Sequence, residues 1–392
     1  MASAASHYLV TGFPRFLTRR WVAQVSTQAP AARITILAQA KFLEDAKAAA
    51  QAIGPGRIDV LSGDVAAMHL GLSGEEYKRL TASVTHVFHS AAITYLGMPR
   101  DVMFRVNVDG TRNMLEFGRD CVALERFAHL STAFVSGDRV GVIAEDELEA
   151  GQGFRNAHEE THFHAERLVQ RAIGQLPITV FRPSSMVGDS RTGEIDRFDG
   201  PYFLGILLAL SPLMLPLPLP GNGSAPLHVV PVDFVVSAMW ALSQETGAVG
   251  RTFHIVDPQP LSARRAYELI AERMNRRTAR FSFPTRAANM MLGLPGVERL
   301  ARPQRTALQY ANHLSFYTSR QGTELLARQG ITCPPLAAYL DVLVSYVRAN
   351  YRKKPEPDAS ADAPDPLDDL PDAPNTTQPV PDRPRFDANE SH

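Results

Sequence analysis

The sequence predicts a doubly wound parallel α/β sheet, followed by a smaller and mostly helical lobe. Short apolar runs alternate with amphipathic segments over the first half of the chain, and the alternation stops after Pro183. Right-handed crossovers between such strands place helices on both faces of the sheet. With 392 residues, the chain is long enough to bury a substantial core.

Six strands are expected in the first half, because each is a short apolar run bounded by turn residues. They are expected at 7–10, 34–37, 58–61, 84–89, 126–131 and 178–182. The segments between them have the apolar spacing of helices, and Ser73 is placed to cap one of these. The helices are expected at 16–25, at 41–52, after Ser73, at 99–118 and at 156–166.

The second half has a different organisation. One strand is expected at 252–256, and helices at 233–243, 262–277 with Ser262 as its cap, 286–292, 320–329 and 336–351. The run 201–231 is rich in leucine and proline and is expected to line or cover a cleft. From residue 352 the composition changes to Pro, Asp and Ala, which predicts a disordered tail. The predicted domains are a core at 1–190, the remaining sheet elements with a substrate lobe at 191–351, and the tail at 352–392.

The composition excludes several classes of protein. A formal net charge of −1 argues against nucleic acid as a partner. Cys121 and Cys333 have no metal-type spacing and indicate a reducing compartment. The chain opens without a signal-peptide pattern, and the most apolar run, 202–220, contains four prolines, which do not suit a membrane-spanning helix. A cytoplasmic protein with no transmembrane segment is expected.

Polar side chains gather after the fifth strand. Ser131 and Thr132 lie at its carboxyl end, where open α/β folds place their ligand crevice. The following helix carries His158 and His162 one turn apart, so both elements are expected to face one cleft. The acidic run 145–149 between them is expected to be a solvated loop.

Motifs in a fixed order support a family resemblance over roughly residues 7–350. They are Thr11-Gly12, Gly63-Asp64-Val65, His89-Ser-Ala-Ala92, Asn107-Val-Asp-Gly-Thr111, Ser131-Thr-Ala-Phe-Val135 and Arg182-Pro-Ser-Ser-Met-Val-Gly188. In this order they resemble the extended short-chain dehydrogenase/reductase family, especially its thioester-reductase and fatty-acyl-reductase branch. The resemblance implies a Rossmann-like core that binds NAD(P).

The resemblance also implies roles for individual residues. Asp64 and Val65 would contact the adenine, Ala91 and Ala92 would pack near the cofactor, and Asn107 would support the active-site helix. The nicotinamide would be bordered by Pro183, Ser184 and Ser185. The first turn, which would meet the phosphates, contributes Gly12, Arg15, Phe16 and Leu17, with Arg19 nearby.

This first turn departs from the family pattern. The fingerprint uses glycines to let backbone amides approach the pyrophosphate, and only Gly12 is retained. Arg15 either clamps the phosphates as a cation or fills their space and blocks the cofactor. Gln39 replaces the acid that grips the ribose in many NAD-binding members, and Arg19 and Lys41 lie nearby, so NADP is favoured over NAD.

The catalytic pair also departs from the pattern. The family has Tyr-x-x-x-Lys where this chain has His158-Glu-Glu-Thr-His162, whereas Thr132 matches the hydroxyl that binds the substrate carbonyl. An imidazole titrates near neutrality, so His158 is a candidate proton donor, and His162 could bond a ribose hydroxyl. His158 and Glu159 also begin a zinc-protease pattern, but no third ligand stands out and no metal is expected.

Two functions therefore stay open at this level. The first is an atypical NAD(P)-dependent oxidoreductase that reduces a small-molecule or carrier-bound carbonyl, either an acyl thioester or an aldehyde, with Thr132, His158, His162 and Asn107 in its active site. The second is a catalytically lapsed member, a pseudoenzyme that acts as a nucleotide or acyl-ligand sensor or as a scaffold. Extended members often pair through helices that flank the fifth strand, so a homodimer is expected by analogy.

Overall fold

The computed structural model describes residues 6–95, 98–196, 223–275 and 313–350. Contacts group Met1–Lys353 into one compact unit, and the boundary expected at residue 190 stays a prediction. The leucine- and proline-rich run 202–220, the helix expected at 286–292 and the tail from 352 lie outside the described residues.

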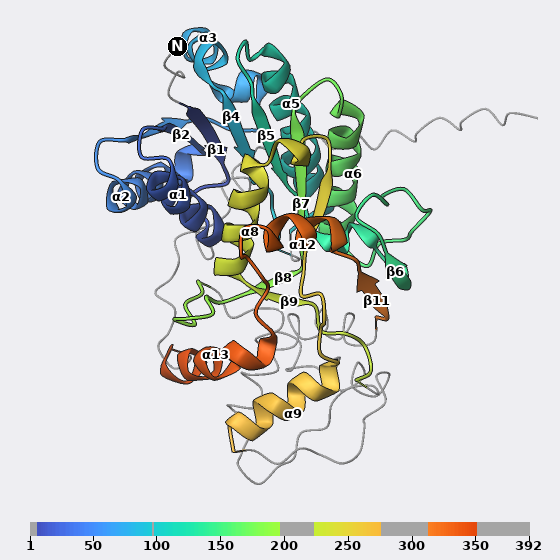
Figure 1. Ribbon diagram of the computed structural model, residues 1–392. Coiled ribbons are helices and arrows are strands. Elements are labelled where there is room, and N and C mark those ends of the chain that lie inside the picture. The colour runs from blue at the N-terminus through green and yellow to red at the C-terminus, as the bar shows by residue number, and fades with distance from the viewer. Residues whose placement is uncertain (1–5, 96–97, 197–222, 276–312, 351–392) are drawn as a thin grey trace, which may run out of the picture. The chain divides into compact units, whose positions relative to one another are not determined.

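Seven parallel strands form one sheet in the order β3-β2-β1-β4-β5-β7-β10, which confirms the doubly wound α/β class (Figure 1). The strands are β1 His7–Thr11, β2 Arg33–Ala38, β3 Ile58–Ser62, β4 His86–His89, β5 Arg126–Leu130, β7 Ile178–Pro183 and β10 Thr252–Ile255. The chain leaves β1 toward β2 on one side and later returns to pair β4 on the other. The crevice of such a sheet therefore opens at the carboxyl ends of β1 and β4.

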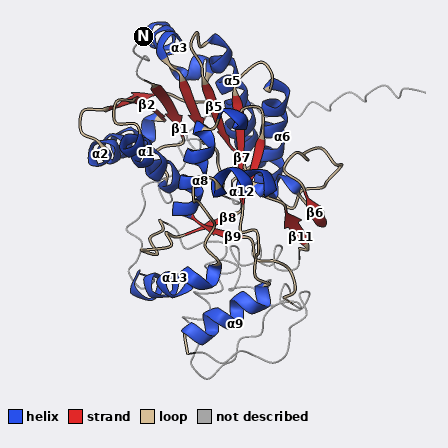
Figure 2. Cartoon of the chain, viewed as in Figure 1, coloured by secondary structure: helices blue, strands red, loops and turns tan. Residues whose placement is uncertain are grey.

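Helices cover both faces of the sheet, as Figure 2 shows in blue against the red strands. One buried apolar cluster includes Trp21, Ala46 and Met239, from three helices on one face, and another includes Leu80, Phe117 and Val169 from the opposite face. The first three helices are α1 Phe16–Gln28, α2 Leu43–Ile53 and α8 Val232–Gln244, and the others are α3 Gly74–Ser83, α5 Gly110–Asp120 and α6 Ala157–Ala172. Short 3₁₀ turns lie at Ala40–Phe42, Met68–Gly71, Ala133–Ser136 and Thr246–Ala248.

The helix expected at 99–118 is interrupted. It consists of α4 Arg100–Met103, a π-helical turn at Phe104–Asp109 and then α5. The apolar pattern predicts a buried face but does not distinguish the wider π-turn from α-helix, which explains the difference. Asn107, one of the expected site residues, lies within this π-turn.

Two small parallel sheets and a helical layer complete the described part. Strand β6 Gly141–Ile143 pairs with β11 Ser315–Tyr317, and β8 Ser185–Val187 pairs with β9 Val229–Pro231. Strands of three residues are too short for a period of two to identify them. Helices α9 Ala263–Arg273 and α13 Leu336–Asn350 share an apolar cluster, and α12 Arg320–Ala327 packs on α8 and β10. Among the described residues, no helix is both long and apolar enough to span a bilayer.

Candidate active site

The end of β5 presents two neighbouring hydroxyl groups with different partners. The Ser131 Oγ donates to Glu166 Oε2 at 2.5 Å, so its hydrogen is already engaged in a hydrogen bond inside the protein. Thr132 Oγ1 accepts from the amide of Phe134 at 3.3 Å and makes only a long contact, 3.5 Å, with the carbonyl oxygen of Pro183. As a donor, the Thr132 hydroxyl therefore makes only a weak hydrogen bond inside the protein. Of the two hydroxyls, it is the one that can donate to the carbonyl oxygen of a ligand.

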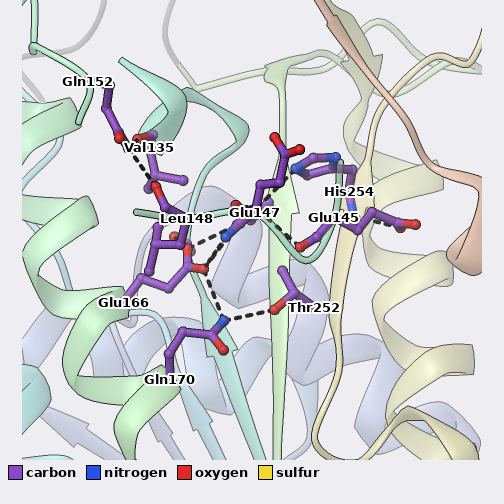
Figure 3. Close-up of polar contacts among 11 residues, drawn as sticks. Val135, Glu145, Glu147, Leu148, Gln152, Glu166, Gln170, Thr252 and His254 are labelled. Atoms are coloured by element: carbon purple, nitrogen blue, oxygen red, sulfur yellow. Dashed lines mark hydrogen bonds and ion pairs between the residues drawn. The ribbon is translucent and has the colours of Figure 1, made fainter. Parts of the chain in front are cut away.

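A buried ion pair joins α6 to β7. Arg182 Nη2 lies 2.6 Å from Glu166 Oε1, and Arg182 Nε donates to both Glu166 oxygens at 3.0 and 3.1 Å. The side chains are 1 % and 0 % exposed. Gln170 adds a bond to Glu166 and another to Thr252 on β10 (Figure 3). This network fixes the second half of α6 against the sheet, and the sequence reasoning missed it because its members lie far apart in the chain.

Asn107 fixes the first half of the same helix. Its Oδ1 accepts from the amide of Ile93 at 2.6 Å, and its Nδ2 donates to the carbonyl oxygen of Ile93 at 3.0 Å. The same Nδ2 donates to Thr161 Oγ1 on α6 at 2.9 Å. Asn107 therefore holds both the loop after β4 and the turn of α6 that lies between His158 and His162.

His158 and His162 lie one turn apart with their ring centroids 4.5 Å from each other. Burial lowers the pKa of His158 to about 4, helped by the nearby positive charge of Arg15. Burial and the neighbouring His158 hold the pKa of His162 well below its ordinary value. Both rings are therefore neutral at pH 7. His158 Nδ1 and His162 Nε2 are buried without a hydrogen-bond partner among the described residues.

The turn after β1 approaches the loop after β4 closely. Gly12 has φ +83°, and a Cβ there would lie 2.5 Å from Ser90 Oγ, so only glycine fits. Arg15 spans the crevice, where its Nη1 donates to the carbonyl oxygen of Ala92 at 2.7 Å and its Nη2 to Thr94 Oγ1 at 2.6 Å. Thr18 Oγ1 lies 3.0 Å from Ser90 Oγ and occupies the space that a glycine would leave open.

The remaining residues expected at the cofactor lie at or after the carboxyl ends of several strands of the main sheet. Leu17 is buried in an apolar cluster, Arg19 is exposed, and Phe16 stacks under the guanidinium of Arg20 at 4.8 Å. Asp64 Oδ1 accepts from the amide of Ala66, and Val65 is buried beneath Gly110. Ala91, Ala92 and Ser185 are half-buried, and Pro183 and Ser184 are buried. Their roles toward a cofactor stay predictions.

These residues fit a dinucleotide in several respects. Helix α1 begins at the crevice without a side-chain cap, and Arg15 adds a cation beside it, an arrangement that suits a pyrophosphate. Ser184 Oγ, like the two imidazole nitrogens, is buried without a partner in the described part of the chain. Buried polar atoms without a partner are uncommon in folded proteins, and a bound ligand is one way to satisfy them. No group of three metal-ligating side chains is present among the described residues.

The acidic run at 145–149 was expected to be a solvated loop, and this expectation is wrong for Glu145, the first residue of the run. Glu145 is 2 % exposed. Its carboxylate accepts from the amide of His254 at 3.1 Å and from the amide of Gln321, in the first turn of α12, at 3.0 Å. Two backbone amides, one from β10 and one from the first turn of α12, offset part of the cost of burying this carboxyl group, and both partners are distant in sequence.

Comparison with known families agrees with the motif order. A family model described as "Male sterility protein" matches residues 20–239, which is more than half of the chain. The match begins after the turn in which the second and third glycines are replaced.

The curated relatives are named as reductases and as nonribosomal peptide synthetases. The chain is 29 % identical over 213 residues to the fatty acyl-CoA reductase wat of Drosophila melanogaster, covering 47 % of this chain and 41 % of that protein. It is 26 % identical over 217 residues to the glycine betaine reductase ATRR of Emericella nidulans, covering 54 % of this chain and 17 % of that protein. The chain thus spans less than half the length of these relatives.

Solved structures share the fold. The terminal R domain of the myxalamid PKS-NRPS pathway superimposes with a TM-score of 0.75 at 24 % identity, covering 91 % of this chain and 94 % of that one. An archaeal thiolation-reductase di-domain superimposes with a TM-score of 0.68 at 18 % identity, covering 88 % and 76 %.

Proposed function

Because the chain belongs to the male sterility protein family, we propose that it is an NAD(P)-dependent carbonyl reductase of the extended short-chain type with an altered proton-donating pair. One observation carries the proposal: Thr132 and the two imidazoles lie on elements that Asn107 and the Glu166–Arg182 pair hold together. Relatives named as an acyl-CoA reductase and an aldehyde reductase support an acyl thioester or aldehyde substrate. A neighbour with a thiolation domain supports a carrier-bound form.

A bound nicotinamide would supply hydride to the substrate carbonyl carbon. Thr132 would turn its hydrogen from the carbonyl of Pro183 to the substrate oxygen and orient it. His158 would deliver the proton that the oxygen needs as negative charge develops. Because the His158 ring is neutral at pH 7, its protonated donor form is a minor species there. Reduction should therefore be slow at neutral pH and faster in acid.

The turn after the carboxyl end of β1 would hold the dinucleotide. Gly12 gives the backbone its tight turn, and the uncapped start of α1 with Arg15 would face the pyrophosphate. Asp64 and Val65 would border the adenine, and Pro183, Ser184 and Ser185 the nicotinamide. The exposed Arg19 and Lys41, with glutamine at position 39, favour NADP over NAD.

A catalytically lapsed member is the second candidate, and Arg15 favours it. Its exposed guanidinium already bonds the loop after β4, at the carboxyl ends of β1 and β4, where it would compete with phosphate oxygens. In this alternative the chain binds a nucleotide or acyl ligand as a sensor or scaffold without turnover.

Calorimetry of the full chain with NADPH and NADH tests both candidates. The reductase proposal expects saturable binding, with NADPH tighter, and consumption of NADPH with a panel of aldehydes and acyl thioesters. Absence of binding by folded protein would eliminate it, and binding without consumption would favour the sensor. His158→Ala should abolish turnover, whereas His164→Ala, on a half-exposed position of the same helix, should leave it intact.

Assembly and compartment are part of the same proposal. A homodimer is proposed by analogy with extended family members, and sedimentation or light scattering of the full chain tests it. A cytoplasmic location is proposed from Cys121 and Cys333, both free thiols, and fractionation tests it.

A further inference from the structure

His89, at the carboxyl end of β4, bridges two threonines from different elements. The side chain is 1 % exposed. Its Nδ1 lies 2.9 Å from Thr11 Oγ1 at the end of β1, and its Nε2 lies 3.1 Å from Thr111 Oγ1 on α5. Both ring nitrogens are therefore used inside the protein.

The neighbouring bonds fix the direction of each contact. Thr111 donates its hydroxyl hydrogen to the carbonyl oxygen of Asn107 at 2.6 Å, so Thr111 Oγ1 must accept from His89 Nε2–H. Thr11 Oγ1 accepts from the amides of Ser90 and Ala91, each at 3.2 Å, which leaves its own hydrogen for His89 Nδ1. His89 is thus the neutral Nε2–H tautomer, and the bonds run in one direction from Thr11 to Asn107.

The two ends of this chain of bonds hold the two halves of the site. At one end, Ser90 Oγ donates to the Thr11 carbonyl oxygen at 2.8 Å and backs the turn at Gly12. At the other end, the Asn107 side chain bonds Ile93 and Thr161 on α6. An apolar side chain in place of His89 would remove the acceptor for the Thr11 hydroxyl hydrogen and the donor to Thr111 Oγ1, both of which are buried.

We infer that His89 is a positioning residue that sets the spacing between the turn after β1 and the helix that carries His158. Its kinetic consequences rest on the proposed reductase function, whereas the hydrogen-bond direction does not. The ring acts through Thr11 on the side of the dinucleotide and through Thr111 and Asn107 on the side of α6.

Nitrogen NMR of the full chain tests the hydrogen-bond direction without any activity. The ¹⁵N shifts of His89 should report a protonated Nε2 and an unprotonated Nδ1, unchanged between pH 8 and pH 5. The Asn107 carboxamide signal should move in His89→Asn and stay in His86→Asn, a matched control because His86 is a buried histidine of the same strand that bonds Thr85. A protonated Nδ1, or a carboxamide signal insensitive to His89, would overturn the inference.

Paired substitutions test the positioning role. His89→Gln keeps a donor that reaches Thr111 but loses the acceptor for Thr11, so NADPH affinity should fall about tenfold with the saturated single-turnover rate unchanged. His89→Asn keeps the acceptor for Thr11 but loses Thr111, so the saturated rate should fall about tenfold with little change in affinity. Equal effects of both variants on both quantities would reduce His89 to a packing role and overturn the inference.

The two hypotheses fail in distinguishable ways. If the wild-type chain binds no NADPH, the reductase proposal is lost, and the NMR measurement on that same protein still decides the role of His89. If NADPH binds and the tautomer is the opposite one, the reductase proposal stands and the positioning role is lost.

Discussion

Two sets of buried polar side chains on α6 differ in how completely the protein satisfies them. In the second half, Glu166 accepts from Ser131, Gln170 and Arg182, all inside the protein. In the first half, His158 and His162 face each other and retain buried nitrogens without a described partner. One helix thus combines a closed structural network with an open set of imidazoles. Substitutions in the closed network should therefore change stability, and substitutions at the imidazoles should change chemistry.

The largest effect should come from breaking the closed network. Glu166→Gln leaves Arg182 buried without its counter-charge and should lower the free energy of unfolding by about 3–5 kcal/mol. The same substitution at Glu160, also on α6 but paired with the exposed Arg100, should cost at most about 1 kcal/mol. Urea unfolding of both variants measures the difference. Equal costs would contradict the role of the buried Glu166–Arg182 pair in fixing α6 against the sheet.

The next effect should come from the open side of the site. Thr132→Val removes the hydroxyl expected to bind the carbonyl oxygen and should lower kcat/KM by about 10²–10³-fold. Its free energy of unfolding should change by less than about 1 kcal/mol, because the hydroxyl makes only long internal contacts. Steady-state kinetics with the best substrate of the panel, together with urea unfolding, measures both. A large loss of stability with activity intact would contradict the assignment.

The pH dependence of turnover sharpens the comparison further. Burial and Arg15 lower the pKa of His158 to about 4, so its protonated fraction rises about tenfold for each pH unit below 7. The single-turnover rate at saturating NADPH should therefore rise as the pH falls from 7 to 5. A rate that falls over this range would indicate a different proton donor. The His158→Gln variant, which cannot titrate, should retain at most a residual single-turnover rate that does not rise between pH 7 and pH 5.

The smallest expected effect concerns stability and the buried ring of His129. This residue is 3 % exposed, and burial lowers the pKa of its imidazole to about 3, below the 6.5 of an unfolded chain. Between pH 6.5 and pH 3, His129 binds a proton in the unfolded state and not in the native state. Its contribution to the free energy of unfolding is therefore unaffected by pH above 6.5 and destabilises the native state increasingly as the pH falls toward 3. His129→Leu should flatten this decline by about 1.4 kcal/mol per pH unit. Urea unfolding at pH 6 and pH 5 checks it, and an unchanged slope would contradict the burial argument.

The seven strands of the main sheet were predictable as short apolar runs bounded by turn residues, and the helices α1 and α8 as amphipathic segments, all with ends within three residues of those observed. Helix α6 was also predicted, but it extends six residues beyond its expected end. The three-residue strands were not predictable, because three residues are too few to show a period. The π-turn at Phe104–Asp109 was not predictable either, because its apolar pattern resembles that of an α-helix.

The site was predictable where a motif carries it and not where distant residues complete it. Thr132, Asn107 and the histidine pair follow from motif order and helical spacing. The partners that hold them, Glu166 with Arg182, do not, because pairing across the fold leaves no local pattern. A signal was available for Glu166, which follows His158 and His162 at the same four-residue interval and so lies on their helix face.

Transfer of deuteride from 4-deuterated NADPH is the sharpest test of hydride transfer at this site. The full chain would be incubated with the labelled cofactor and an aldehyde or acyl-thioester panel, and the products analysed by mass spectrometry. We expect deuterium on the former carbonyl carbon with the wild-type chain and at least about a hundredfold less with Thr132→Val, because one carbonyl-binding donor is lost. Folded wild-type protein that binds NADPH and transfers no deuterium to any member of the panel would contradict it.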